Sequence, residues 1–438
     1  MKIVILGGGE SGVGSAVLAH SLGHDVFLSD GGMLRDDYKH TLESLGIPFE
    51  EGGHQFENLA DATLIVKSPG IADNAAIVKK LNELEIPTIS EIEFGYRHTD
   101  AKIIAITGSN GKTTTTSLVY HILNQAGFNV ALGGNIGKSF AALVAEGGYD
   151  YYVLEISSFQ LDGIQDFRPD IAILLNITPD HLDRYDYKFE NYIASKFRIT
   201  ENQTKKDLMI YWAEDPVIAS NSQFFNNLTK KKGIKGPFVK DGIFSIGDFA
   251  CQADNISIKG PHNEINAACA VTAALDLGIT DEVIANALAT FVNMPHRLEY
   301  VATIGGVSFI NDSKATNVDA AWYGLSAVNN PVIWIVGGTD KGNDYTPLTE
   351  QVKNKVKAIV CMGADNSKII DFFSNIVETI KDTHSAEEAV DIAFSLANQG
   401  DTVLLSPACA SFDLFNNYEH RGETFKKAVK NLIIKIES

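Results

Sequence analysis

Cysteine is scarce in this 438-residue sequence, and the four cysteines, at positions 251, 269, 361 and 409, form no C-x-x-C pair. A disulfide framework or a cysteine-based zinc site is therefore not expected. Long hydrophobic runs are missing too, since no stretch approaches the roughly 18 apolar residues of a membrane span. The N-terminus turns glycine-rich too early for the apolar core of a secretory signal. Together these absences predict a protein of the reducing cytoplasm.

Positive charge is also in short supply, because 36 Lys and Arg face 55 Asp and Glu, giving a formal net charge of -19. No nucleic-acid partner is expected, since binding the phosphates of a duplex needs a basic surface. A small anionic ligand remains compatible with this charge, held by a few local cations and backbone N–H groups. The length predicts about three domains.

Short apolar, β-branched runs alternate with helical patterns, which predicts an α/β protein with parallel sheets. We expect domains at residues 1–98, 99–295 and 296–438, and a surface connection at Asn221–Gly236, which is rich in Asn, Lys and Gly. The expected helices are Gly12–Leu22, Thr114–Gln125 and Asn263–Asp276. The expected strands are Ile3–Leu6, Asp25–Ser29, Thr63–Val66, Ile86–Ile89, Ile103–Ile106, Tyr151–Ile156, Ile171–Leu175, Val307–Ile310, Val332–Val336, Ala358–Cys361 and Thr402–Leu405.

A first glycine loop, Gly7–Gly12, fits the G-x-G-x-x-G pattern between a strand and a helix. Asp30 ends the next strand, where an acid that binds a ribose would lie. Glycines let the backbone approach a pyrophosphate, and a helix N-terminus favours anions. The pattern is only moderately specific. A structural turn, an NAD site and a site for another nucleotide diphosphate are all compatible with it.

A second glycine loop, Thr107–Thr114, is the strongest signal in the chain, because a clear strand precedes it and a clear helix follows it. Its backbone N–H groups can surround phosphates, Lys112 can reach the terminal phosphates, and the Thr113 hydroxyl can bind Mg²⁺. The general pattern G-x-x-x-x-G-K-[ST] requires a glycine at position 106, where this chain has isoleucine. The loop is therefore a shorter variant with its glycine at position 108.

Three residues of the central segment are candidates for a metal site. Glu155 ends a strand, where an acid often faces the ligand crevice. His181 and Lys196 follow it in the chain. Each has a simpler explanation when taken alone: a solvated strand end for Glu155, a surface histidine for His181 and a solvated lysine for Lys196. Because Mg²⁺ prefers oxygen ligands, a histidine or lysine ligand would be unusual.

Several further motifs occur in a fixed order along nearly the whole chain. They are Gly108–Thr114, Gly133–Gly137, Leu154–Leu161, Asn176–Asp183, Lys196, His262–Asn263 with Asn266, Pro295–Glu299, Asn311–Asn317 and Leu405–Asp413. In order and spacing they resemble the Mur ligase superfamily of amide-bond-forming synthetases. The resemblance implies a Rossmann-like N-terminal domain, a central P-loop-type ATP-binding domain with a parallel sheet, and a Rossmann-like α/β C-terminal domain.

The resemblance also implies how ATP and metal ions are held. Two Mg²⁺ ions, which Mn²⁺ could replace, would be bound by Thr113, Glu155, His181 and Lys196, the lysine being carbamylated in the family. A carbamate removes the ammonium charge and supplies carboxylate-like oxygens, which suit Mg²⁺. Lys112, Glu155, His181 and Lys196 would be the catalytic residues. Residues from two domains would bind ATP: Gly108, Ser109, Asn110, Gly111, Lys112, Thr113, Thr114, Asn263, Asn266, Arg297 and Asp312.

The family further implies the other substrates. The first glycine loop would bind the uridine diphosphate of UDP-N-acetylmuramoyl-L-alanine, so NAD is not expected. The contacts with this substrate would come from Ser11, Gly12, Val13, Asp30, Gly70, Asn135, Ser157 and Gln160. The motifs of residues 311–317 and 405–413 resemble the type that adds D-glutamate, and the Asp-Asn-Pro-Arg motif of relatives that add diaminopimelate or lysine does not occur. The D-glutamate contacts would be Thr316, Lys341, Ser411, Phe412 and Tyr418, although Phe412 and Tyr418 depart from the usual residues.

The predicted function is therefore ATP-dependent formation of an amide through an acyl phosphate, by a cytoplasmic monomer with no membrane span. Three alternatives stay open at this point. A related ligase could add another amino acid or join folate to glutamate, a nucleotide-binding protein could use the phosphate loop without ligation, and an NAD oxidoreductase would leave the second loop unused. The general base for the amine, His181 or a nearby carboxylate, is also open.

Overall fold

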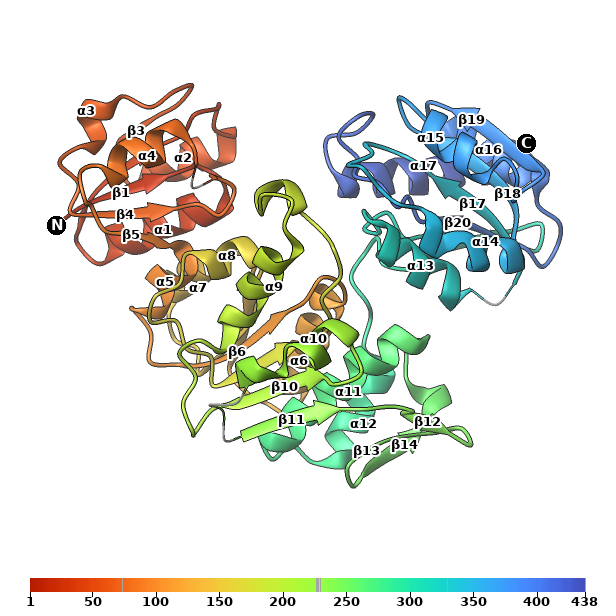
Figure 1. Ribbon diagram of the computed structural model, residues 1–438, viewed down its shortest axis with the longest axis horizontal. Coiled ribbons are helices and arrows are strands. Elements are labelled where there is room, and N and C mark those ends of the chain that lie inside the picture. The colour runs from red at the N-terminus through yellow and green to blue at the C-terminus, as the bar shows by residue number, and fades with distance from the viewer. Residues whose placement is uncertain (73, 226–227, 229, 329, 438) are drawn as a thin grey trace. The chain divides into compact units, whose positions relative to one another are not determined.

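The computed structural model describes residues 1–72, 74–225, 228, 230–328 and 330–437 (Figure 1). The chain forms two compact units. The first unit comprises Met1–Ser257 and Asn263–Phe291, and the second comprises Ile258–His262 and Val292–Ser438. Among the described residues, none of the helices combines the length and the apolar character needed to cross a membrane.

The first unit begins with a parallel five-stranded sheet of order β3-β2-β1-β4-β5. Ligands of such sheets bind beyond the carboxyl ends of the strands, where the strand order reverses, here between β1 and β4. The first glycine loop follows β1 directly and so begins at this point. The strands are β1 (Lys2–Leu6), β2 (Asp25–Ser29), β3 (Phe49–Glu50), β4 (Leu64–Lys67) and β5 (Thr88–Ser90), and the helices are α1 (Glu10–Ser21), α2 (Asp36–Ser44), α3 (Phe56–Leu59), α4 (Ala76–Asn82) and α5 (Glu91–Tyr96).

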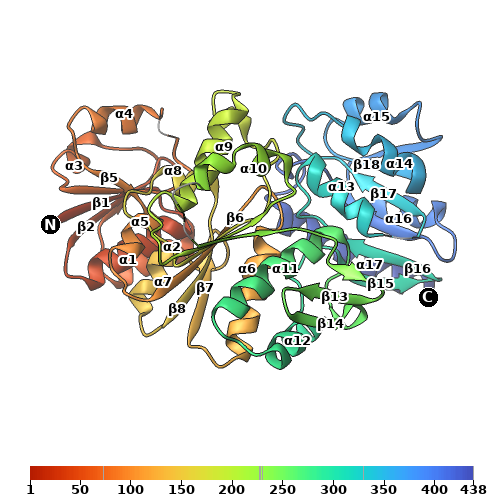
Figure 2. The same cartoon turned by 60° about the horizontal axis from the view of Figure 1, so that its bottom comes forward.

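A second parallel sheet, of order β11-β10-β9-β6-β8-β7, follows in the same unit. Its central strand β6 leads into the second glycine loop, and α6, which begins directly after that loop, packs against α12 (Figure 2). The strands are β6 (Lys102–Thr107), β7 (Val130–Gly134), β8 (Tyr151–Glu155), β9 (Ile171–Leu174), β10 (Leu208–Trp212) and β11 (Lys230–Ile234). The helices are α6 (Lys112–Gln125), α7 (Phe140–Glu146), α8 (Ser158–Asp162), α9 (Phe189–Phe197), α10 (Pro216–Ser220), α11 (Pro261–Asp276) and α12 (Asp281–Thr290).

The prediction of a surface connection at Asn221–Gly236, of which positions 226, 227 and 229 lie outside the described residues, was wrong in one part. Part of it, Lys230–Ile234, forms the edge strand β11 and pairs in parallel with β10. Lys230, Lys231 and Lys232 are exposed on this strand, so it lacks the apolar run by which buried strands are recognised. The small antiparallel sheet β12 (Val239–Lys240), β13 (Ile243–Ile246) and β14 (Phe249–Gln252) that comes next was not predicted.

One hydrophobic core runs through both sheets of the first unit, from Ile3 in β1 to Leu228. Within it, α1 packs closely on α7. A Cβ atom at Gly14 of α1 would lie 2.0 Å from the Ser139 side chain, so the approach of the two helices depends on the absence of a side chain there. The same core residues thus join the N-terminal sheet to the central one.

The second unit is a six-stranded sheet of order β15-β16-β20-β17-β18-β19 with helices on both faces. Only β15 is antiparallel to its neighbour, β16. One core packs α16 and α17 on the sheet, and another packs α13, α14 and α15. The strands are β15 (Glu299–Ile304), β16 (Val307–Asn311), β17 (Val332–Val336), β18 (Val356–Met362), β19 (Thr379–Thr383) and β20 (Thr402–Leu405). The helices are α13 (Val318–Ala327), α14 (Thr349–Lys355), α15 (Ser367–Phe373), α16 (Ala386–Leu396) and α17 (Tyr418–Glu437).

Candidate functional site

The second glycine loop is held by the segment that follows β9. Backbone N–H groups of Ser109 and Asn110 donate to the carbonyl and the side-chain oxygen of Asn176, at 2.9 and 2.8 Å. The Ser109 hydroxyl donates to the Thr178 carbonyl at 2.9 Å. The loop ends at Gly111, whose φ of 82° is left-handed, and α6 starts at Lys112. The helix thus begins two residues before the predicted Thr114.

Polar side chains at or beyond the ends of β6, β7 and β8 come together at this loop. The Thr113 hydroxyl, at the start of α6, donates to Glu155 Oε2 at 2.7 Å. The other oxygen of this carboxylate accepts from the Asn135 side-chain amide at 2.9 Å. Glu155 is 2% exposed, at the end of β8. A hydroxyl and a carboxylate side by side supply the oxygen ligands that Mg²⁺ prefers.

Two lysines donate to one carbonyl oxygen of the loop. Lys112 Nζ lies 2.8 Å from the Gly108 carbonyl oxygen and 2.8 Å from that of Ser109. Lys196 Nζ, on α9, reaches the same Gly108 oxygen at 2.9 Å. Burial, and then the charge of Lys112, hold the pKa of Lys196 well below its usual value. Lys196 is only 1% exposed, so the simple explanation of a solvated surface lysine does not apply.

His181 differs from these residues in being exposed. It lies in the segment after β9, with a left-handed φ of 54°, just before the short 3-10 helix Leu182–Arg184. Its ring packs edge-on against Phe159 of α8, with 5.1 Å between centroids, and its Nε2 is 3.6 Å from an Asp180 oxygen. His181 therefore has a more open environment than Lys196.

Helix α11 also reaches the loop. The Asn266 amide donates to Asn263 Oδ1 at 3.1 Å, and both side chains are buried. A Cβ atom at Gly111 would lie 2.4 Å from Asn266 Oδ1. The glycine at position 111 is therefore required twice, for its left-handed backbone and for the closeness of Asn266.

In the N-terminal sheet, Asp30 organises the first glycine loop. Its carboxylate accepts the backbone N–H groups of Gly8 and Gly32. Ser11, Gly12 and Val13 lie in the first turns of α1, and Val13 is part of the core. Gly70 is exposed, and its carbonyl accepts a hydrogen bond from Arg184 at 3.3 Å.

The remaining acceptor candidates of the first unit, Ser157 and Gln160, form the N-terminal cap of α8. The Ser157 hydroxyl accepts from the Gln160 backbone N–H at 3.3 Å, and the Gln160 side chain accepts from the Ser157 backbone N–H at 2.9 Å. This reciprocal cap fixes the start of α8, directly after the strand that ends at Glu155.

In the second unit, Arg297 lies just before β15, and Asp312 directly follows β16. The Asp312 carboxylate accepts from the Ser406 hydroxyl at 2.9 Å and from the Leu298 backbone N–H at 3.2 Å. Burial raises the pKa of Asp312 to about 7, against the lowering effects of Ser406 and Arg297. Among the described residues, Arg297 Nε and His262 Nδ1 are buried without a hydrogen-bond partner. Such groups are available to a polar ligand.

The amino-acid candidates lie on three segments of the second unit. Thr316 follows β16, Lys341 is exposed on the loop after β17, and Ser411 is 2% exposed in the segment after β20. The other two candidates are Phe412, which is 69% exposed, and Tyr418, which begins α17. The backbone carbonyl of Tyr418 accepts from the Ser313 hydroxyl at 2.8 Å, which ties α17 to the Asn311–Asn317 motif.

The sequence interpretation missed Arg421, which joins these segments. Its buried guanidinium donates to the Ser313 hydroxyl and carbonyl at 3.0 and 2.9 Å, and to the Cys409 carbonyl at 3.1 and 3.2 Å. It also donates to the Gly337 carbonyl at 3.3 Å. The sequence does contain a sign of this burial. Arg421 lies four residues before Phe425 and therefore on the buried face of the amphipathic helix α17.

Comparison with known proteins agrees with this arrangement. Family models match residues 2–77 as a MurD N-terminal domain, residues 106–274 as a Mur ligase middle domain and residues 296–409 as a Mur ligase, glutamate ligase domain. A protein of Christiangramia forsetii named UDP-N-acetylmuramoylalanine–D-glutamate ligase is 50% identical over 98% of this chain and 99% of its own. One of the same name from Bacteroides fragilis is 49% identical over 98% and 100%. The chain belongs to the Mur ligase family.

Solved structures add the fold of this Mur ligase. The UDP-N-acetylmuramate-alanine ligase MurC of Thermotoga maritima superposes with a TM-score of 0.63 at 20% identity, covering 98% of this chain and 99% of that one. MurF ligase of the same organism, solved with ADP, gives 0.63 at 17% identity over 93% and 95%. The predicted three-domain α/β fold is confirmed, and this Mur ligase is an ATP-dependent, amide-bond-forming enzyme. The alternatives of an NAD oxidoreductase and of a binding protein without ligase activity are thereby set aside.

Proposed function

We propose that this Mur ligase joins D-glutamate to UDP-N-acetylmuramoyl-L-alanine through an acyl phosphate, releasing ADP and phosphate, as a step in making peptidoglycan precursors. The main support is that Lys112, Thr113 and Glu155 converge at one phosphate loop, in a chain about half identical over its full length to ligases of that name. We further propose that it works as a cytoplasmic monomer, where ATP is available and free cysteines stay reduced.

The loop residues suit the phosphoryl transfer. A carboxylate is a poor electrophile until the γ-phosphoryl group of ATP converts it into a mixed anhydride. That step brings two anions together, so positive charge must neutralise them. Lys112 supplies a cation, and the backbone N–H groups of residues 108–114 surround the phosphates. Thr113 and Glu155 would hold a Mg²⁺ ion, or Mn²⁺ in its place, which contributes further charge neutralisation when bound.

Lys196 suits a carbamate for a second metal ion. An amine must be uncharged to take up carbon dioxide, and burial next to Lys112 lowers the pKa of Lys196 in that direction. The carbamate would supply oxygens, with His181 as a further ligand. His181 is exposed and close to Asp180, so either of these two side chains is available to accept the proton of the attacking amine.

The other assignments follow the segments described above. Asn263 and Asn266 lie on α11, where Asn266 faces the phosphate loop at Gly111. Both are proposed to contact ATP, as are Arg297 and Asp312. The N-terminal loop with Ser11, Gly12, Val13, Asp30 and Gly70 is proposed to bind the uridine diphosphate, and the acceptor is proposed to contact Asn135, Ser157 and Gln160. In the second unit, the cation of Lys341 and the hydroxyls of Thr316 and Ser411 are suited to the carboxylates of D-glutamate, next to Phe412 and Tyr418.

One assay tests the proposal. The purified chain is incubated with ATP, Mg²⁺, UDP-N-acetylmuramoyl-L-alanine and one of a panel of amino acids, including both enantiomers of glutamate, and phosphate release is followed. We expect release that requires both the acceptor and D-glutamate. Release with another amino acid, or release that ignores the acceptor, would show that the proposed substrates are wrong.

A further inference from the structure

The loop that carries Lys341 is tied to the segment that carries Ser411 over its whole length. We call residues 337–345 the Lys341 loop and residues 406–411 the Ser411 segment. At the start of the loop the ties are backbone hydrogen bonds, from Gly337 to the Pro407 carbonyl at 3.0 Å and from Thr339 to the Ala410 carbonyl at 2.8 Å. A Cβ atom at Gly338 would lie 2.1 Å from the Ala410 oxygen, so the two segments approach as closely as a glycine permits.

In the second half of the loop, the Asp340 carboxylate fixes the shape of the turn. One oxygen accepts from the backbone N–H groups of Gly342 and Asn343 at 2.6 and 2.9 Å, and from Lys368 Nζ at 3.0 Å. The other accepts from the Tyr345 hydroxyl at 2.8 Å. Burial would raise the pKa of Asp340, but these hydrogen bonds outweigh it and lower the pKa, so the group is an anion. Lys341 lies inside the turn that the anion closes.

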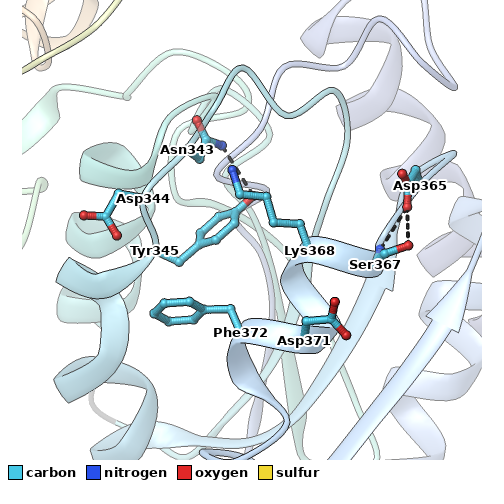
Figure 3. Close-up of a pocket in the computed structure, with 8 residues that line it drawn as sticks. All are labelled: Asn343, Asp344, Tyr345, Asp365, Ser367, Lys368, Asp371 and Phe372. Carbon is cyan, nitrogen blue, oxygen red and sulfur yellow. Dashed lines mark hydrogen bonds between the residues drawn. The ribbon is translucent and has the colours of Figure 1, made fainter.

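Tyr345 and Asn343 extend this network to the Ser411 segment. The Tyr345 side chain is 1% exposed, and its hydroxyl lies 3.3 Å from Cys409 Sγ. The Asn343 amide donates to the Ala408 carbonyl at 3.1 Å. Figure 3 shows Asn343 and Lys368 reaching the hydroxyl end of the Tyr345 ring, with Phe372 beneath it, in the wall of a surface pocket. The chain of contacts runs from the turn around Lys341 to the residues just before Ser411.

We propose that Asp340 is a positioning residue for the amino-acid substrate, which together with Tyr345 sets the place of Lys341 relative to Ser411. This inference rests on the proposed function, in which Lys341 binds a carboxylate of D-glutamate. A lysine has a flexible side chain, so it can present its ammonium to one carboxylate of a small amino acid with good affinity only if its backbone is fixed. A mobile loop would add an ordering cost to each binding event. The network therefore acts on the affinity for the amino acid and leaves the chemical step unchanged.

The test uses the variants Asp340→Asn and Tyr345→Phe. Initial rates are measured while the concentration of each substrate is varied in turn. Asp340→Asn keeps the size of the side chain but removes the charge that faces Lys368, and it turns an acceptor into a donor. We expect the KM for D-glutamate to rise about tenfold or more, which corresponds to ~1.4 kcal/mol. Changes in kcat and in the KM for ATP and for the UDP substrate should stay within about twofold. Tyr345→Phe keeps the ring and should raise the same KM by a smaller factor.

The matched control is Asp365→Asn, a carboxylate in the wall of the same pocket whose hydrogen bonds go to Ser367. It should leave the KM for D-glutamate unchanged. A proportional loss of kcat and of all three affinities in Asp340→Asn would indicate a purely structural role and overturn the proposal. So would an unchanged KM in both variants. If Asp340→Asn does not fold, Tyr345→Phe alone decides by the same criterion.

Failure of the proposed function is recognisable separately, because the wild type would then release no phosphate in response to D-glutamate. The network is tested in that case by amide hydrogen exchange of residues 337–345 and 406–411. Faster exchange in both segments of folded Asp340→Asn, with no change in Asp365→Asn, would support the coupling of the two segments. Unchanged exchange in the Ser411 segment would overturn it.

Discussion

The phosphate loop of the first unit and the Lys341 loop of the second unit each follow a buried parallel strand, but they are held in different ways. The phosphate loop is fixed mainly by its own backbone geometry, by Asn176 and by the start of α6. The Lys341 loop is held by its own side chains, above all Asp340, by contacts with the Ser411 segment, and by Arg421, which donates to the Gly337 carbonyl. The comparison shows that a local motif accounts for much of the shape of the phosphate loop, whereas the Lys341 loop is held by contacts with a segment far from it in the sequence.

The largest expected effect is in the first region. Lys196→Ala should reduce the rate of phosphate release by roughly a hundredfold to a thousandfold, since it removes a group placed at the phosphate loop. In carbonate-depleted buffer, added bicarbonate should raise the activity of the wild type and leave the variant unaffected. Lys188→Ala, at an exposed lysine just before the same helix, is the control and should keep normal rates. Near-normal activity of Lys196→Ala would rule out the carbamate.

In the second region, Arg421→Met should destabilise the protein by about 3 kcal/mol, because several buried carbonyls lose a charged donor at once. Burial lowers the pKa of Arg421 to about 10, so the guanidinium still carries its charge at neutral pH. Urea unfolding measures the stability, and the KM for D-glutamate should rise as well. Lys427→Met, at an exposed site on the same helix, should change neither quantity. Equal effects of the two variants would contradict the role given to Arg421.

A smaller effect is expected at the end of the phosphate loop. Gly111→Ala places an alanine in a left-handed conformation, at a cost of roughly 1–2 kcal/mol, and its Cβ would meet Asn266 at 2.4 Å. Gly127→Ala has nearly the same φ, 80° against 82°, but open space around the Cβ. Both should lower the melting temperature, whereas only Gly111→Ala should raise the KM for ATP. A normal KM for ATP in Gly111→Ala would show that the contact of Asn266 with the loop is unimportant.

The last expected effect is a pH dependence of stability to which both units contribute. Burial raises the pKa of Glu91, in the first unit, to about 7, and that of Asp312, in the second unit, also to about 7. A raised carboxyl pKa means that the folded chain binds the proton more tightly than the unfolded chain, so stability is full at low pH and falls as pH rises towards 7. Asp312→Asn and Glu91→Gln should each remove part of this fall. Calorimetry at about pH 5 and about pH 8 tests it, and identical slopes in wild type and variants would refute it.

Local patterns predicted the elements whose burial leaves a mark in the sequence. The strands Val332–Val336 and Thr402–Leu405 have the predicted bounds, because each is fully buried and β-branched or apolar. Strand β19 escaped prediction because Lys381 and Asp382 are exposed, as are the three lysines of β11. Such edge strands are stabilised by pairing with a neighbour, which a sequence does not display.

The same division applies to the candidate site. The glycine loop, Lys112 and Thr113 were predictable because the phosphate-binding pattern is local. The close approach of Asn266 to Gly111 arises because α11 packs against the phosphate loop, although the two are far apart in the sequence. Arg421 and the Asp340–Tyr345–Cys409 contacts likewise depend on which loops the sheet of the second unit brings together. Long-range packing of this kind cannot be inferred from spacing alone.

The edge strand β11 has a consequence for how copies of this protein behave at high concentration. A parallel sheet that ends in an open strand offers backbone groups to which a strand of another copy could pair. Here the edge carries Lys230, Lys231 and Lys232 in succession. Asp276 pairs with both Lys230 and Lys232, so one carboxylate faces three ammonium groups. Two copies meeting along this edge would bring the remaining positive charges together, and their repulsion would oppose sheet extension. A short run of lysines on an edge strand of this strongly acidic protein is therefore expected to disfavour association through that edge.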